Sequence, residues 1–125
     1  MNKKEEDYIN IQIYALFFTI LSVIISLVLT INQKLEIKGQ KTLFNSKKTF
    51  KITKFNRILI LILGIVFLYV NYALYKISKK EKEDLKPYIL QIFASVLTVI
   101  TALITLYVVT LSTKGNVSDI ENPII

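Results

Sequence analysis

Three long runs of apolar residues, separated by charged segments, dominate the pattern of the sequence. The runs cover residues 9–31, 57–77 and 88–112, and almost every charged residue lies outside them or at their ends. An uncharged run of about 18 or more residues, at about 1.5 Å per residue of helix, matches a hydrocarbon layer of roughly 30 Å. The pattern therefore predicts a single membrane domain over residues 1–125: an all-α integral membrane protein with three transmembrane helices.

The segments between the runs predict how the helices are connected. Residues 1–8 form a charged N-terminal tail, residues 32–56 a long basic segment, and residues 78–87 a short charged connection. Because that connection is so short, the second and third spans are expected to form an antiparallel hairpin. Residues 113–125 are expected to be a flexible C-terminal tail.

Small and hydroxyl side chains recur at helical spacing in the first and third spans. In each span these residues step by three or four positions, so they share one face of a helix. Such faces let helix backbones approach closely and provide weak hydrogen bonds between helices, which favours helix packing over the alternative of a hydrophilic pore wall. The predicted packing residues are Thr19, Ser22 and Ser26 in the first span, and Gln91, Ser95, Thr98, Ala102 and Thr105 in the third.

The second span carries two further packing residues, Gly64 and Asn71, which are seven positions apart and so lie on nearly the same face. An amide in hydrocarbon is costly unless it is hydrogen-bonded, so Asn71 is expected to face another helix. In the predicted hairpin, Asn71 and Ser95 lie at similar depth, about 10 Å from the same membrane surface. We therefore predict a contact between Asn71 and Ser95, shared with Thr19. A ligand or ion contact at Asn71 is the alternative.

The long basic segment mixes cationic and aromatic residues, and neither a helical nor a strand period fits it cleanly. This mixture is typical of a segment at the membrane surface, with aromatic rings among the headgroups and cations on the phosphates. We interpret residues 32–56 as a basic interfacial loop bound to anionic lipid, into which the first helix can continue through Lys34 and Lys38 as far as a stop at Gly39. A dedicated docking site is the alternative. The predicted headgroup contacts are Lys47, Lys48, Lys51, Lys54 and Arg57.

Composition excludes several kinds of chemistry. The sequence contains no cysteine and no histidine, so neither a disulfide framework nor a histidine or thiolate metal site is expected. The interiors of the three runs carry no Asp, Glu, Lys, Arg or His, the residues that mark proton relays and ion pathways. Three glycines form no phosphate-binding loop, and no nucleophile motif is present. We therefore expect no enzyme activity, no cofactor and no metal.

The net charge of +7 does not indicate a nucleic-acid partner. Basic loops beside membrane spans are expected from the positive-inside bias and from anionic headgroups, and no nucleic-acid-binding motif accompanies them. Lysine and arginine number seven on the side of the N-terminus and nine on the other, which favours a cytoplasmic C-terminus. The abundance of isoleucine, lysine and asparagine favours a low-GC bacterium and hence its cytoplasmic membrane.

Three functional hypotheses fit these features. The favoured one is an accessory or scaffolding subunit that packs against a larger membrane protein or against copies of itself. The second is a homo-oligomeric pore former, since the number of spans, the chain length and the net positive charge are similar to those of small bacteriophage holins. The weakly acidic C-terminal tail departs from the strongly charged tail that is usual in holins. The third is an immunity-type protein that protects a bacterium from a membrane-active peptide.

Overall fold

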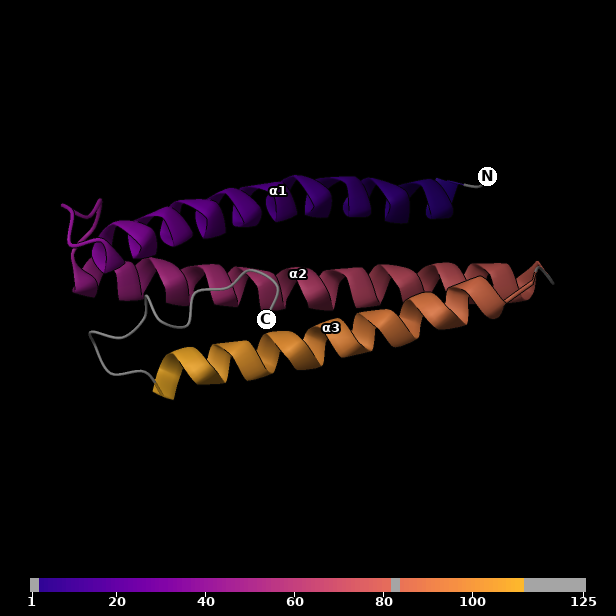
Figure 1. The fold of residues 1–125 in the computed structure, drawn as a ribbon. Coiled ribbons are helices and arrows are strands. Elements are labelled where there is room, and N and C mark those ends of the chain that lie inside the picture. Colours follow the sequence, from indigo (N-terminus) through magenta and orange to yellow (C-terminus); the bar gives the residue numbers. More distant parts are fainter. Residues whose placement is uncertain (1–2, 82–83, 112–125) are drawn as a thin grey trace.

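The fold of this chain, in a computed structural model that describes residues 3–81 and 84–111, consists of three helices (Figure 1). They are α1 (Lys3–Ile37), α2 (Ser46–Lys80) and α3 (Lys86–Leu111). All three are long and apolar enough to cross a membrane. The predicted all-α class and the number of membrane-length helices are confirmed.

Helix α2 lies at the centre of the molecule. In Figure 1, α1 and α3 flank it on opposite sides, and α2 makes extensive contacts with both. Ser22 of α1 lies beside Asn56 of α2, while Asn32 further along α1 lies beside Thr49, so these two helices are antiparallel. Helices α2 and α3 are also antiparallel and form the predicted hairpin. In the described chain, α1 and α3 therefore run in the same direction and α2 runs in the opposite one.

Residues 38–45 connect α1 to α2, and the helix ends on both sides of this connection are capped. Gly39 has a positive φ of 69°, and its N–H donates to the carbonyl of Glu36 at 3.0 Å. The N–H of Gln40 donates to the carbonyl of Leu35 at 2.9 Å, which completes a glycine-ended helix terminus. The side chain of Asn45 then accepts from the N–H of Lys48 at 2.8 Å and begins α2. The prediction that Gly39 ends the first helix is confirmed.

The prediction of a loop over residues 32–56 is wrong for most of that segment. Its first residues, 32–37, belong to α1, and residues 46–56 form the first three turns of α2. The buried face of these turns consists of Thr49, Thr53 and Asn56, which are spaced by four and three residues. A helical period is therefore present, but polar side chains carry it, so the apolar pattern does not reveal it.

The other segment boundaries also differ from the prediction. Helix α1 begins at Lys3 within the predicted tail 1–8, and α2 extends to Lys80 into the predicted connection 78–87. Ser112 and the predicted flexible tail 113–125 lie outside the described residues.

In the observed contact between α1 and α2, the apolar runs of the two helices are shifted along the helix axis and do not lie level with each other. Because Ser22 lies beside Asn56, the part of α1 that follows Ser22 lies beside the basic beginning of α2. That part of α1 is apolar on its outside, where Ile24 and Leu27 are exposed. The lysines of α2 at positions 47, 48, 51 and 54 are exposed as well. An apolar surface and a cationic surface therefore meet at this end of the molecule.

Candidate functional site

A buried hydrogen-bonded cluster joins the middle of α1 to α2. The hydroxyl of Ser22 donates to Oδ1 of Asn56 at 2.7 Å, and Nδ2 of Asn56 donates to Oγ of Ser26 at 2.8 Å. All three side chains are almost fully buried. The amide thus has a partner on each side, which removes the free-energy cost of burying it. Ser22 and Ser26 were predicted as packing residues, and here they contact a residue that the prediction had placed in a loop.

A second cluster centres on Asn32, at the end of the first apolar run. Its Oδ1 accepts from the backbone N–H groups of Leu43 and Phe44 at 2.8 and 3.1 Å. Its Nδ2 donates to the hydroxyl of Thr49 at 3.2 Å. One buried amide therefore holds the end of α1, the connection and the start of α2 together. The sequence pattern did not predict this role of Asn32. The one signal for it in the sequence is that an asparagine directly follows the apolar run.

Two more polar residues of α2 are buried close to these clusters. Thr53 is 0% exposed, and among the described residues its hydroxyl has no hydrogen-bond partner. Arg57 is only 3% exposed. The structure therefore places Arg57 inside the protein and not at the surface where a headgroup contact was predicted. The four lysines predicted beside it, at positions 47, 48, 51 and 54, do lie on the surface.

The contact between α2 and α3 has a different character. Nδ2 of Asn71 donates to Oγ of Ser95 at 2.6 Å, so the predicted contact between these residues is present. A Cβ atom placed on Gly64 would lie 3.4 Å from Cγ2 of Val99, which shows how closely the two helices approach there. Ala102 and Thr105, predicted packing residues of α3, are buried.

The predicted participation of Thr19 in the Asn71 contact is not seen, because the Thr19 hydroxyl has another partner. It donates to the carbonyl of Ala15 at 2.9 Å, one turn earlier in α1. Thr98 likewise donates to the carbonyl of Ala94 at 2.9 Å. Such bonds satisfy a hydroxyl within its own helix, so it needs neither water nor a second helix. Gln91, the remaining predicted packing residue, is exposed near the start of α3.

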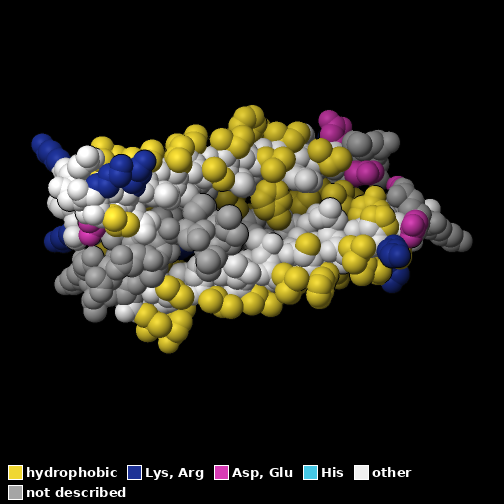
Figure 2. All heavy atoms as spheres, in the orientation of Figure 1, with side chains coloured by type: hydrophobic (Ala, Val, Ile, Leu, Met, Phe, Trp, Pro, Cys, Tyr) yellow, Lys and Arg dark blue, Asp and Glu magenta, His cyan; other side chains and the backbone are white. Residues whose placement is uncertain are grey.

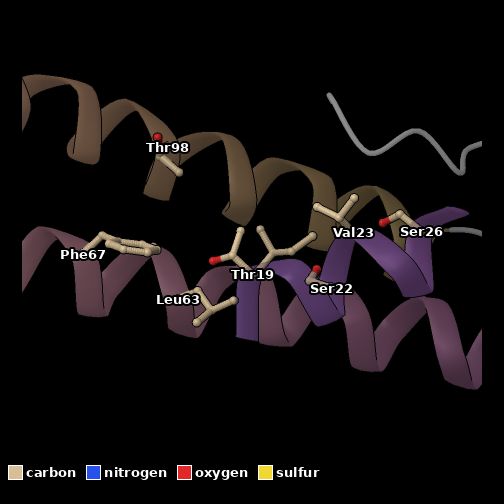
Figure 3. Close-up of a pocket in the computed structure, with 9 residues that line it drawn as sticks. Thr19, Ser22, Val23, Ser26, Leu63, Phe67 and Thr98 are labelled. Carbon is tan, nitrogen blue, oxygen red and sulfur yellow. The ribbon is translucent and has the colours of Figure 1, made fainter. Parts of the chain in front are cut away.

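All three helices line a pocket of about 200 Å³, which we call the inter-helix pocket (Figure 3). Its wall is mainly apolar; the hydroxyls of Thr19, Ser22 and Thr98 already donate elsewhere, and that of Ser26 accepts from Asn56. None of the described residues that line it has a titratable side chain. The pocket is therefore suited to apolar groups and not to a polar substrate. Its lining residues are Thr19, Ser22, Val23 and Ser26 of α1, Ile60, Leu63, Gly64 and Phe67 of α2, and Thr98 of α3.

The described part of the chain, residues 3–81 and 84–111, contains no group of three or more Asp and Glu residues placed to hold a metal ion. Comparisons of the chain with models of known protein families, with curated proteins and with solved structures find no match. The functional argument therefore rests on the geometry of the helices and their contacts.

Proposed function

We propose that this protein is a non-enzymatic accessory or scaffolding subunit that binds a helix of a larger membrane protein. Its place is the cell membrane, and specifically the bacterial cytoplasmic membrane. The observation that carries the proposal is the inter-helix pocket, in which small side chains from three helices leave an apolar recess. Side chains of a further helix fit recesses of this kind, and small residues allow the close backbone approach on which helix association in membranes depends.

The surface of the molecule supports placement in a membrane. Large apolar side chains are exposed along the outer faces of α1 and α3, whereas charged side chains gather at the two ends (Figure 2). Soluble monomeric proteins rarely expose continuous apolar patches larger than a few hundred Å². A bilayer covers such faces and leaves the charged ends among the lipid headgroups.

The hydrogen-bonding pattern favours packing over a pore within this chain. The Asn56 amide is hydrogen-bonded on both sides and Asn71 donates to Ser95, while the α2 residues between them that line the inter-helix pocket include Ile60, Leu63 and Phe67. A water-filled path needs continuous polar lining, which this stretch of α2 does not supply.

The test compares two threonines of α3 that are alike except for their position. Thr98 lines the inter-helix pocket, whereas Thr110 does not; both are exposed, and both donate to a carbonyl of their own helix. Thr98→Phe fills the pocket and is expected to reduce the amount of co-purified partner in mild detergent by about tenfold, equivalent to about 1.4 kcal/mol. Thr110→Phe is expected to leave that amount unchanged.

Mass determination of the purified complex, with identification of its chains, is the readout. Recovery of a larger membrane protein that is lost only with Thr98→Phe supports the proposal. A defined multimer of this chain alone, with dye leakage from vesicles, would replace it with the pore hypothesis. Protection of cells from a membrane-active peptide, without leakage and without a co-purified membrane protein, would replace it with the immunity hypothesis.

A further inference from the structure

A second and larger pocket, of about 850 Å³, lies where α1 begins and α2 ends. Lys4 and Tyr8 of α1 line one side, and the last turns of α2, from Tyr69 to Glu81, line the other. We call it the tyrosine–lysine pocket. It is at the opposite end of α2 from the lysines at positions 47–54 for which headgroup contacts were predicted.

The charge of this pocket is strongly cationic. Among the described residues, four lysines line it, Lys4, Lys76, Lys79 and Lys80, against one carboxylate, that of Glu81. Lys79 and Lys80 occupy the last turn of α2, where the helix dipole favours a positive charge. The acidic residues of the first turns of α1, at positions 5–7, do not line the pocket. The lining therefore attracts an anion.

Tyrosine rings give the pocket a fixed wall. The rings of Tyr8 and Tyr69 meet edge to face across the two helices, with centroids 5.8 Å apart. Nζ of Lys76 lies 4.8 Å from the centre of the Tyr72 ring, in cation–π contact. Ala73 and Ile77 add apolar surface. The pocket thus combines an aromatic and apolar wall with ammonium groups.

This combination matches one class of ligand. Tyrosine rings concentrate at the depth of lipid headgroups, and clustered lysines close to a membrane surface attract the headgroups of anionic phospholipids. A volume of about 850 Å³ exceeds what an inorganic phosphate fills, and the apolar wall has no partner in a free phosphate. We infer that the tyrosine–lysine pocket binds the phosphodiester headgroup of an anionic phospholipid, with the first part of an acyl chain against the tyrosine rings. This inference rests on the membrane placement in the proposed function.

The test is native mass spectrometry of the protein in mild detergent, titrated with phosphatidylglycerol or with phosphatidylcholine. One phosphatidylglycerol is expected to bind in preference to phosphatidylcholine. The double substitution Lys76→Gln and Lys80→Gln is expected to weaken this binding by at least about tenfold. Each lysine near an anionic headgroup adds to the binding free energy, and this variant removes two of them. Tyr72→Leu, which leaves every charge in place, is expected to weaken it by a smaller factor.

The matched control is Lys34→Gln with Lys38→Gln, which removes the same charge from exposed positions at the opposite end of the molecule, for which no headgroup contact was predicted. Equal weakening by the control pair, or equal binding of the two lipids, would overturn the inference. Displacement of the lipid by inorganic phosphate at a comparable concentration would also overturn it, in favour of a simple phosphate site. Extraction of the chain from membranes by alkaline carbonate would instead refute the membrane placement, so the two failures are distinguishable.

Discussion

Helix α2 is held on its two sides in different ways. Against α1 it places amides and hydroxyls that hydrogen-bond across the interface: Asn56 with Ser22 and Ser26, and Thr49 with Asn32. Against α3 it places Gly64, which lets the two helix backbones approach closely, and Asn71, whose amide donates to the hydroxyl of Ser95. The hydrogen bonds to α1 lie along the basic half of α2, and the close approach to α3 at Gly64 lies along its apolar half.

This difference follows from the sequence of α2. Residues 46–57 carry polar side chains on nearly every face, so this part of the helix has no apolar stripe to bury. It packs because α1 offers serine hydroxyls and an asparagine amide at matching heights. The lysines then point outward, while Thr49, Thr53 and Asn56 point inward. A helix segment that looks like a solvated loop in the sequence becomes part of the core.

The largest effect is expected where the backbones are closest. Gly64→Leu must place a large side chain where even a Cβ atom lies 3.4 Å from Val99, so it is expected to lower the free energy of unfolding by about 3 kcal/mol. Thermal unfolding in mild detergent, followed by circular dichroism, is the measurement. Gly64→Ala is the control: it needs only a small adjustment and gains helix propensity, so it is expected to change stability by less than about 1 kcal/mol. Equal stability of the two variants would show that the α2–α3 interface is not closely packed here.

A smaller effect is expected at the polar interface. Asn56→Leu removes both hydrogen bonds to the serines and is expected to lower the free energy of unfolding by about 2 kcal/mol. The same substitution in a background of Ser22→Ala and Ser26→Ala is expected to cost far less, because the amide has already lost its partners. Additive effects in this cycle would argue against hydrogen bonding across the interface.

The smallest effect is expected at the single amide of the closely packed interface. Asn71→Leu removes the bond to Ser95 and is expected to cost about 1 kcal/mol, in line with hydrogen bonds between membrane helices. Ser95→Ala, alone and in combination with Asn71→Leu, completes the cycle, and the combined loss is expected to fall short of the sum. If Asn71→Leu changes neither assembly nor thermal stability, the contact is not important for either.

The sequence predicted best those structural features that depend on residues close to one another along the chain. The three apolar runs predict the three helices, and Gly39 predicts the end of the first because a positive φ favours glycine. The Asn71–Ser95 contact was predictable because a short connection fixes the relative depth of two antiparallel helices. In each case the deciding residues are near one another in the sequence or are tied by a short turn.

The rest depends on how α1 and α2 are aligned, which the sequence leaves open. Asn32 bonds to residues 11, 12 and 17 positions away, and Asn56 to residues 30 and 34 positions away. Matching the two apolar runs end to end would have placed Thr49 near Ile37 and left Asn56 without its serines.

Disulfide crosslinking in isolated membranes tests this alignment most directly, and the chain contains no native cysteine to interfere. The pair Asn32→Cys and Thr49→Cys joins positions whose side chains are 3.2 Å apart across the α1–α2 interface, so rapid and nearly complete crosslinking is expected. The pair Ile37→Cys and Thr49→Cys, which meets only if the apolar runs are matched end to end, is expected to crosslink slowly and poorly. Efficient crosslinking of the second pair but not the first would contradict the polar α1–α2 interface on which this account depends.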